Sequence, residues 1–365
     1  MPKRGNSKQS MQLQERINAF VTLGQFMGQF ASQSNIVKVD GLSFNDTFFD
    51  GMLAQIQLAK HKNGWFIEEH VHFTCKSWSE ALSEENVTRW LSAYTIPEKS
   101  TPKTVGLIMA GNIPLVGFHD FLTVLLSGHS VIAKLSSNDK ALLPFLAEYL
   151  IAIAPELKEY ISFSEEKLEG FDAVIATGSN NSARYFEYYF GKYPHIIRKN
   201  RNSVAVLSGN ETPAQMIALS DDVYRYFGLG CRNVSKIYIP KDYNFDAFYN
   251  GMYTWKEVIN NHKYINNYDY NKAVYLMSDI KLLDNEFLLL KEDAGFSSPI
   301  SVVFYETYDN LSEIQTKLSE EKDTIQCVVS NMGITGEIPF GETQTPQLWD
   351  YADGVDTMDF LLKLN

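Results

Sequence analysis

Cysteine is scarce in this sequence, and its occurrences are far apart. The 365 residues include only Cys75, Cys231 and Cys327. An odd number of distant cysteines provides neither a disulfide framework nor the paired spacing of a zinc site, so we expect no metal. This usage fits a reducing compartment, and we expect a cytoplasmic protein.

Long apolar runs and an excess of positive charge are missing as well. No run of about 18 apolar residues occurs, so we expect no membrane span. The first ten residues are basic but lead into no apolar segment, so we expect no signal peptide. The net charge of −12 argues against nucleic acid as the main partner, although a local basic pocket for an anionic cofactor is compatible with it.

The chain has enough apolar sequence for a large core. Hydrophobic residues make up 45% and charged residues 21% of its positions, as in ordinary soluble globular proteins. The length suits two domains or one large α/β unit.

The first hundred residues predict helices. Apolar residues recur at helical spacing from Leu13 to Phe30. A second helix is predicted from about Asn45, acting as N-cap, to Lys60, and a third helical region spans 64–91. We expect a helical cap or a substrate-side subdomain here.

Strands and helices alternate after Pro102. Helices are predicted to begin at Ile113-Pro114, at Asn138 and after Ser179. Continuous apolar runs predict buried parallel strands at 104–110, 130–136 and 173–179. This β-α-β-α-β-α order is typical of a doubly wound sheet with right-handed crossovers.

Three turns follow these strands at the edge where open α/β sheets bind ligands. They are Ala110-Gly-Asn-Ile-Pro114, Lys134-Leu-Ser-Ser-Asn138 and Thr177-Gly-Ser-Asn180. None is a GxGxxG fingerprint or a Walker loop, so they either hold a nucleotide by another arrangement or are plain βα turns.

The second half continues with strands and helices. A helix is predicted from Thr212-Pro, and Cys327 falls in a strand and is expected in the core. Further strands are predicted at 236–239, 301–305 and 325–330, and helices at 245–261 and 311–321.

Cys231 stands out because Gly228 and Gly230 precede it. Glycines there allow a tight backbone turn and leave room for a substrate beside the sulfur. A thiol in this place is a candidate nucleophile, and the alternative is a small buried apolar residue.

Five pieces of the sequence occur in the order of a known superfamily. They are Ala110-Gly-Asn-Ile-Pro114; Ile132-Ala-Lys134; Thr177-Gly-Ser179; Gly228-Leu-Gly-Cys231; and Phe296-Ser-Ser-Pro299 with Pro339-Phe-Gly341. Together they resemble the aldehyde dehydrogenase superfamily, and more closely the LuxC-type acyl-CoA reductases, over about residues 100–345.

The resemblance implies an α/β fold of the aldehyde dehydrogenase type. It implies a Rossmann-like nucleotide-binding domain, an α/β catalytic domain and a helical N-terminal part that packs on the nucleotide-binding domain. The expected divisions are 1–100 (helical), 101–205 (nucleotide-binding), 206–335 (catalytic, with Cys231) and 336–365 (a C-terminal return or oligomerisation segment).

One departure from the superfamily is informative. Hydrolytic members carry a glutamate that activates water, and the corresponding stretch here, Arg198-Lys-Asn-Arg-Asn-Ser203, has no carboxylate. This favours an enzyme that transfers or reduces an acyl group, and also allows an inactive copy. Arg198 and Arg201 could lower the pKa of Cys231 or meet CoA phosphates, but we expect a solvated basic turn.

The resemblance implies reduction of an acyl-CoA or acyl-carrier thioester to the aldehyde through an acyl-cysteine on Cys231. Asn112 and the Cys231 backbone N–H would stabilise the oxyanion, although Asn112 could instead cap a helix. His119 could serve as a base, but we expect an ordinary helix histidine.

The implied cofactor is NADP, with NAD as the alternative, because no acidic residue closely follows Lys134 to take the ribose hydroxyls. The residues expected at the cofactor are Lys134, Ser136, Ser137, Gly178, Ser179 and Glu292.

Two other functions stay open at the sequence level. One is a CoA-acylating aldehyde dehydrogenase acting on short aldehydes, and the other is a catalytically inactive binding homologue. The superfamily also implies a homo-oligomer, with an acyl-CoA or acyl-carrier as the partner molecule.

Overall fold

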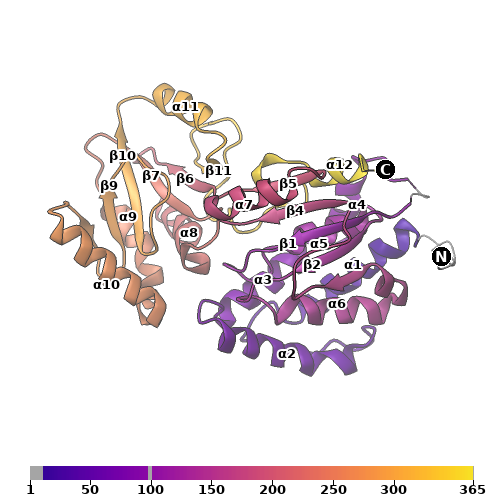
Figure 1. The fold of residues 1–365 in the computed structure, drawn as a ribbon. Coiled ribbons are helices and arrows are strands. Elements are labelled where there is room, and N and C mark those ends of the chain that lie inside the picture. The colour runs from indigo at the N-terminus through magenta and orange to yellow at the C-terminus, as the bar shows by residue number, and fades with distance from the viewer. Residues whose placement is uncertain (1–10, 98–100, 365) are drawn as a thin grey trace. The chain divides into compact units, whose positions relative to one another are not determined.

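A computed structural model describes residues 11–97 and 101–364, and the expectation about a signal peptide concerns residues outside these ranges. The chain forms two compact units (Figure 1). The first contains residues up to 199 together with 347–351 and 355–365, and the second contains 200–346 and 352–354.

The first unit is built on a five-stranded parallel sheet of order β3-β2-β1-β4-β5. Its strands are β1 (Thr104–Ile108), β2 (Ser130–Lys134), β3 (Ile161–Phe163), β4 (Ala173–Thr177) and β5 (His195–Arg198). Strands β2 and β3 are added in turn on one side of β1, and β4 and β5 are added in turn on its other side. Right-handed crossovers therefore place their helices on opposite faces.

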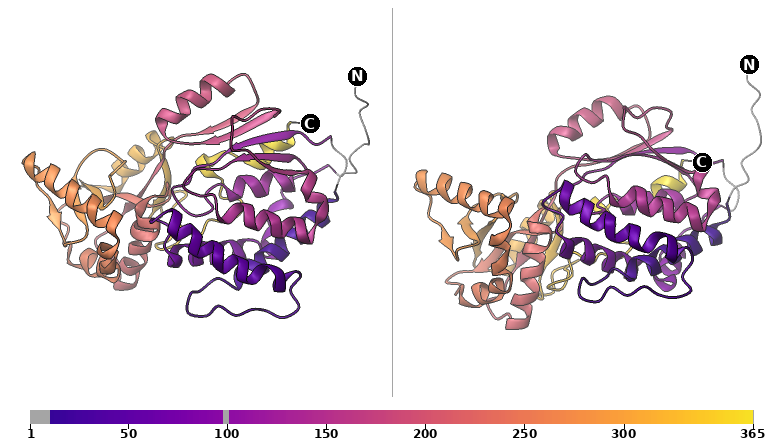
Figure 2. Two further views of the ribbon diagram at one scale, coloured as in Figure 1. Left: turned by 60° about the horizontal axis from the view of Figure 1, so that its bottom comes forward. Right: turned by 90° about the horizontal axis from the view of Figure 1, so that it is seen from below.

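Helices cover both faces of this sheet. Figure 2 shows α7 on one face and α1, α2 and α6 on the other. The helices of the unit are α1 (Leu13–Gly28), α2 (Asn45–Lys62), α3 (Glu68–Ala81), α4 (Glu84–Leu91), α5 (Phe118–Leu126), α6 (Leu142–Ile153), the 3-10 helix η1 (Pro155–Glu159), α7 (Asn180–Phe190) and α12 (Thr357–Leu362).

The N-terminal helices share one apolar core with α5 and α6. The Phe26 ring stacks on Tyr149 at 4.2 Å, and Phe20 lies 6.4 Å from Phe118. From the C-terminal segment, Leu361 joins the same core. The apolar stripe of α1 thus packs on helices of the doubly wound sheet instead of forming a separate bundle.

The second unit has a six-stranded sheet of order β11-β6-β7-β10-β9-β8, parallel except for the β8–β9 pair. Its strands are β6 (Asn202–Val206), β7 (Val234–Pro240), β8 (Leu283–Asp284), β9 (Leu289–Glu292), β10 (Val302–Tyr308) and β11 (Ile325–Val329). Its helices are α8 (Pro213–Tyr224), η2 (Arg225–Gly228), α9 (Asp246–Met252), η3 (Tyr253–Asn260), α10 (His262–Met277), α11 (Leu311–Glu320) and η4 (Ala352–Gly354).

The predicted α/β fold is confirmed, but some predicted helix starts are wrong. Asn45 is not an N-cap, because its amide donates to Gln29 and to the Val39 carbonyl while Phe44 holds the cap position. The helix expected at Ile113 begins only at Phe118. The helix expected at Asn138 likewise begins at Leu142. The residues before both of these helices are used in turns, which are described below.

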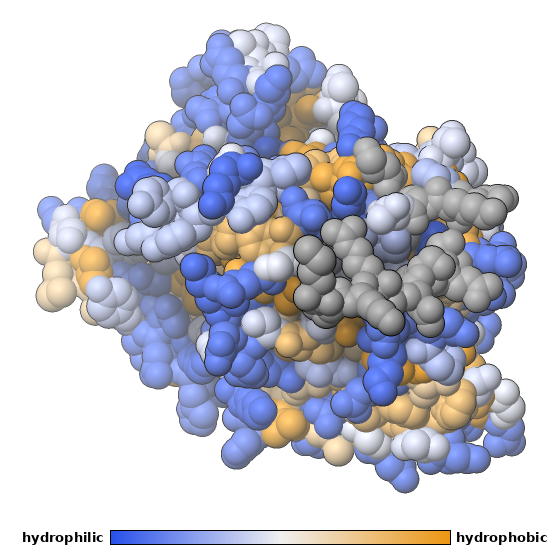
Figure 3. Space-filling model, turned by 45° about the vertical axis from the view of Figure 1, so that its right-hand side comes forward, coloured by the Kyte–Doolittle hydropathy of each residue, from blue (hydrophilic) through white to orange (hydrophobic). Residues whose placement is uncertain are grey.

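Hydrophilic and apolar residues are interspersed on the face of the molecule drawn in Figure 3. None of the described helices is long and apolar enough to cross a membrane.

Candidate functional site

The first unit brings together three of the predicted turns. In the ladder, Ile108 of β1 pairs with Lys134 of β2 on one side and with Ala176 of β4 on the other. The turns after these parallel strands therefore begin side by side at the carboxyl edge of the sheet. The predicted residues that share this edge are Asn112, Lys134, Ser136, Ser137, Gly178 and Ser179.

The first two turns are interlocked. The Met109 N–H donates to the Lys134 carbonyl at 3.0 Å. A Cβ on Gly111 would lie 2.6 Å from the Ser136 side chain, so this close approach requires glycine. Asn112 is thereby held half-buried at the edge.

A buried carboxyl that the sequence analysis missed lies between these turns. Asp139 accepts the Leu115 N–H at 3.0 Å, and Leu115 has left-handed backbone (φ 56°). Burial raises the pKa of Asp139 to about 6, opposed by the Leu115 hydrogen bond. Its other oxygen has no hydrogen-bond partner among the described residues. The contact joins residues 24 positions apart, so it becomes visible only when the fold places the Asn112 turn next to Asp139.

The turn after β2 is suited to an anion. Lys134 is half-buried at the strand end and Ser137 is exposed. The Ser136 hydroxyl accepts the Asn138 N–H at 3.3 Å and stiffens the turn. A cation beside exposed hydroxyl and backbone donors is a suitable donor set for a nucleotide phosphate.

The third turn leads into α7. The Ser179 hydroxyl caps this helix by accepting the Ser182 N–H at 3.2 Å. A Cβ on Gly178 would lie 2.8 Å from Ser182 and 2.9 Å from the Phe186 ring, so glycine lets the strand end approach the helix. The start of the eleven-residue α7 presents N–H groups that favour an anion.

Cys231 lies in the second unit, three residues before β7. It is exposed, whereas Cys75 and Cys327 are buried, and the core position predicted for Cys327 is confirmed. Among the described residues no oxygen atom accepts a hydrogen bond from the Cys231 backbone N–H. The backbone N–H of Cys231 interacts instead with the sulfur of the same residue.

The backbone before Cys231 turns through three left-handed residues. Gly228 (φ 74°) does so as predicted, but Tyr226 (φ 55°) and Phe227 (φ 58°) do so too. Each non-glycine residue in this region costs on the order of 1 kcal/mol or more, which the burial of both aromatic side chains offsets. No local sequence signal marks aromatic residues for this conformation.

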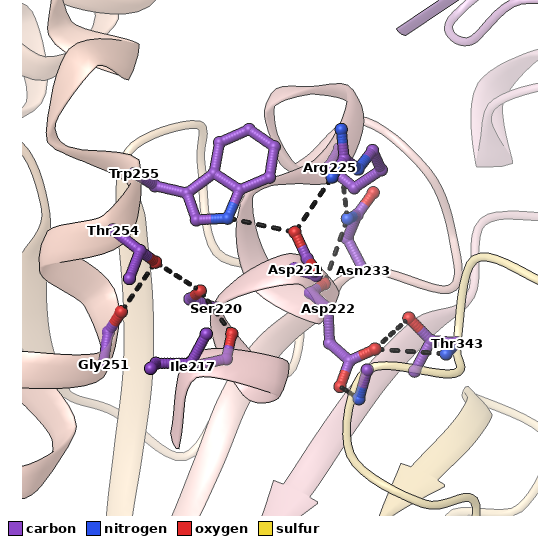
Figure 4. Close-up of polar contacts among 11 residues, drawn as sticks. Ile217, Ser220, Asp221, Asp222, Arg225, Asn233, Gly251, Thr254, Trp255 and Thr343 are labelled. Atoms are coloured by element: carbon purple, nitrogen blue, oxygen red, sulfur yellow. Dashed lines mark hydrogen bonds and ion pairs between the residues drawn. The ribbon is translucent and has the colours of Figure 1, made fainter. Parts of the chain in front are cut away.

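A buried asparagine closes the cysteine loop. The Asn233 side chain accepts the Gly230 N–H at 2.8 Å and donates to the carbonyls of Asp222 (3.0 Å) and Arg225 (2.8 Å) (Figure 4). Three hydrogen bonds from one side chain thus fix both ends of the loop that carries Cys231.

The carboxylate of Asp222 extends this network to the Pro339-Phe-Gly341 segment. It accepts the Gly341 N–H at 2.7 Å, the Thr343 N–H at 3.1 Å and the Thr343 hydroxyl at 2.8 Å. Burial raises the pKa of Asp222 to about 6, and these three donors oppose the rise. Figure 4 shows Asp222 between Asn233 and Thr343. The end of α8 therefore anchors both the loop of Cys231 and the Pro339-Phe-Gly341 segment.

The electrostatics favour the protonated thiol in the resting protein. Although Cys231 is exposed, the protein atoms around its sulfur desolvate it and raise the pKa of the thiol to about 11. The Arg232 guanidinium opposes this rise, while Cys327 and Asp353 add to it. The Arg232 side chain also donates to the Cys327 sulfur at 3.3 Å.

The solvated basic turn expected at 198–203 is wrong. Arg198 is buried, forms an ion pair with Asp120 and donates to the Thr357 hydroxyl at 2.9 Å. Arg201 lies 3.4 Å from the carboxylate of Asp353 in the second unit. Asp353 is thus a carboxylate in the electrostatic surroundings of Cys231 that the sequence analysis did not find, because it lies 122 positions further along the chain.

Two other predicted residues are placed as follows. Glu292 is the exposed last residue of β9, in the same unit as Cys231 and not in the unit that carries Lys134. The prediction that His119 is an ordinary helix histidine is confirmed, because its Nε2 lies 2.8 Å from the Leu348 carbonyl.

No group of three or more described His, Cys, Asp or Glu residues is arranged to hold a metal ion.

Comparisons with known proteins agree with this geometry. The family model for "Acyl-CoA reductase (LuxC)" matches residues 83–247, a range that includes Asn112, Lys134, Ser179 and Cys231. The predicted resemblance to the LuxC acyl-CoA reductases is confirmed. No curated protein matches the chain in a sequence comparison.

Solved structures of aldehyde dehydrogenases share the fold. Aldehyde dehydrogenase 21 of Physcomitrella patens, in complex with the product succinate, has a TM-score of 0.60 at 11% identity, covering 96% of this chain and 87% of that one. An aldehyde dehydrogenase of Mycobacterium tuberculosis, complexed with NAD⁺, has a TM-score of 0.55 at 14% identity, covering 86% and 72%. An indole-3-acetaldehyde dehydrogenase complexed with NAD⁺ has a TM-score of 0.57 at 13% identity, covering 88% and 77%.

The chain therefore has the aldehyde dehydrogenase fold, and its residues 83–247 are similar to the LuxC acyl-CoA reductases.

Proposed function

We propose that this protein reduces an acyl-CoA, or another acyl thioester, to the aldehyde with NADPH or NADH. The observation that carries the proposal is that Cys231 alone of the three cysteines is exposed, on a loop fixed by Asn233. The LuxC match over this loop supports the same chemistry.

In the proposed reaction the Cys231 sulfur forms a bond to the thioester carbonyl carbon, and the bond from that carbon to the CoA sulfur breaks. Because the pKa of the thiol is raised, the proton of Cys231 must leave as the new bond forms, and the departing CoA thiolate can take it. The products of this step are an acyl-cysteine and free CoA thiol.

Stabilisation of the oxyanion is the second role of the chain. The Cys231 backbone N–H and the Asn112 side-chain amide are the proposed donors, and such a donor contributes on the order of 3 kcal/mol. The interlocked turns of the first unit hold Asn112 in place through the contact between Gly111 and Ser136.

A bound nicotinamide cofactor would supply the hydride that reduces the acyl-cysteine. The residues proposed to hold it are those at the carboxyl edge of the first sheet, with Lys134 and Ser137 at the adenosine end and Gly178 and Ser179 under the pyrophosphate. Glu292 is proposed for the nicotinamide ribose. We prefer NADPH, because Lys134, Ser136 and Ser137 offer a cation and hydroxyls, while the carboxyl of Asp139 is buried and accepts the Leu115 N–H.

After hydride addition, the bond between the former carbonyl carbon and the Cys231 sulfur breaks. The aldehyde leaves, and the Cys231 thiolate takes up a proton from solvent to restore the thiol. Hydrolysis of the acyl-cysteine would waste the intermediate, and the stretch 198–203 offers no carboxylate to activate water. Arg201 forms an ion pair with Asp353, the carboxylate named above in the electrostatic surroundings of Cys231.

The test is NADPH and NADH consumption with a series of acyl-CoAs of increasing chain length. We expect Cys231→Ala to lower turnover by at least about 1000-fold, as removal of a nucleophile does, while Cys75→Ala in the core keeps it. Mass spectrometry should find an acyl adduct on Cys231 and none on Cys75 or Cys327.

Absence of both acyl adduct and acyl-dependent cofactor oxidation in the wild type would refute the proposal. Turnover with short aldehydes, CoA and oxidised cofactor, but not with acyl-CoA and reduced cofactor, would favour the oxidative CoA-acylating reaction.

A further inference from the structure

The strand that follows the cysteine loop carries a fully buried lysine. Lys236 is the third residue of β7, and its side chain has no exposed surface. Its ammonium group donates to the successive carbonyls of Asp293 (3.0 Å), Ala294 (2.8 Å) and Gly295 (3.1 Å). It also forms an ion pair with Glu306. The three N–H bonds of the ammonium are thus surrounded by four protein acceptors.

A β-bulge brings a second side chain to the same loop. In the ladder between β6 and β7, Val234 and Lys236 pair with successive residues of β6, so Ser235 is an extra residue. A bulge re-aims neighbouring side chains that would otherwise point to opposite faces of the sheet. The Ser235 hydroxyl donates to the Phe296 carbonyl at 2.6 Å. Two adjacent side chains therefore hold four successive carbonyls.

Carbonyls that converge on one point need a cation between them, because their oxygen dipoles repel each other. Backbone carbonyls serve this way around free cations in ion-binding sites. Here the rings of Tyr238 and Phe296 lie 5.2 and 5.0 Å from the Lys236 ammonium and shield it from water. The cage is complete with the lysine in place, so the cation is tethered and not exchangeable.

The loop held in this way begins at a candidate cofactor residue. Residues 293–296 directly follow Glu292, the last residue of β9. We infer that Lys236 is a positioning residue, a tethered cation that fixes the 293–296 loop, and with it Glu292, to the strand that follows Cys231. The role of Glu292 at the cofactor rests on the proposed function, whereas the anchoring of the loop does not.

Lys236→Met tests this inference, with Lys317→Met as the matched control. Lys317 donates to both oxygens of the same Glu306 (2.9 and 2.8 Å), but in the described chain it donates to no carbonyl of residues 293–296. In Lys236→Met we expect amide hydrogen exchange at 293–297 to rise at least about tenfold, as loss of several buried hydrogen bonds implies. The control should keep slow exchange there.

Comparing the KM for NADPH with the acylation rate of Cys231 separates a positioning role of Lys236 from a general loss of structure. We expect the KM for NADPH to rise at least about tenfold in Lys236→Met, while acylation of Cys231 by acyl-CoA stays within about threefold of the Lys317→Met rate. In Lys236→Ala, propylammonium replaces the missing part of the side chain and should restore the KM. Tetramethylammonium has the same charge but no N–H donor and should not.

Equal behaviour of the two methionine variants in exchange and in KM would overturn the inference, and so would a parallel collapse of acylation and cofactor binding that propylammonium does not rescue. If Lys236→Met does not fold, Ser235→Ala replaces it, with faster exchange expected at 296–297 and unchanged exchange refuting the anchor. If the wild type shows neither acylation nor NADPH turnover, the proposed function is refuted. The inference about Lys236 is still decided by the hydrogen exchange at 293–297.

Discussion

At the scale of single residues, Cys231 combines an exposed position with a raised pKa. Most activated cysteines have a lowered pKa because a cation or helix N-terminus stabilises the thiolate. In this protein desolvation outweighs the nearby Arg232 guanidinium. We therefore expect the resting thiol to react slowly with oxidants and alkylating agents until its proton is removed.

This property predicts the pH dependence of thiol modification. Because the pKa of Cys231 is raised to about 11, its thiolate fraction should grow about tenfold per pH unit from pH 7 to 9, with no plateau. The rate of iodoacetamide alkylation at Cys231, followed by mass spectrometry, should rise in parallel. A plateau near pH 7 would show that an unrecognised group stabilises the thiolate.

At the scale of elements, the cysteine loop depends on one asparagine of β7's leading turn. Asn233 is buried and its side chain makes three hydrogen bonds to the backbone of the loop and of α8. The two left-handed aromatic residues in this loop are strained, so the loop would relax without this restraint.

Asn233→Ala should therefore lower both stability and activity. Removing these buried bonds is expected to cost about 2–4 kcal/mol of unfolding free energy and to slow Cys231 acylation at least about tenfold. Urea unfolding and the acylation rate at a temperature where the variant is folded measure the two effects. Asn244→Ala, which removes an exposed asparagine, is the control. Acylation at the control rate would show that the loop keeps its shape without Asn233.

Element boundaries show where local sequence sufficed and where it did not. The prediction of α8 from Thr212-Pro is confirmed, because the Thr212 hydroxyl caps the helix within the same turn. Asp139 looked like part of a helix start, but it receives the Leu115 N–H from a turn 24 positions earlier. Strand β5 is not predicted by the sequence analysis, because only its pairing with β4 makes His195–Arg198 extended.

At the scale of the whole molecule, each unit contains a buried carboxyl whose pKa is raised. Asp139 lies in the first unit and Asp222 in the second, and burial raises the pKa of both to about 6. A carboxyl whose pKa is higher in the folded than in the unfolded protein stabilises the fold below about pH 4, and this contribution is lost as pH rises through about 6. A shift of this size corresponds to about 3 kcal/mol for each group.

Asp139→Asn should remove the pH dependence that Asp139 gives to the unfolding free energy. The amide can still accept the Leu115 N–H and carries no buried charge, so relative to the wild type the variant should gain about 1–3 kcal/mol of unfolding free energy between pH 5 and pH 8. Urea unfolding followed by tryptophan fluorescence at both pH values measures this gain. Asp269→Asn, at an exposed position, is the control. Identical pH responses of the two variants would contradict the burial effect.

The domain divisions, the homo-oligomer, the cytoplasmic location and the roles of the site residues stay predictions. The resemblance to the LuxC acyl-CoA reductases is confirmed over residues 83–247, and the fold is confirmed by solved structures of aldehyde dehydrogenases.

The sequence by itself determined the parts that local order encodes: the alternating strands and helices, the three βα turns with Asn112, Lys134 and Ser179, and the glycine-flanked Cys231. Apolar periodicity and turn chemistry act over a few residues, so they can be read along the chain. Only the tertiary structure decided the cage around Lys236, the Asp222 contact with Thr343, and the place of Asp353. These depend on groups brought together from about 60 to about 150 positions apart, and a polar residue looks the same in sequence whether water or such a partner surrounds it.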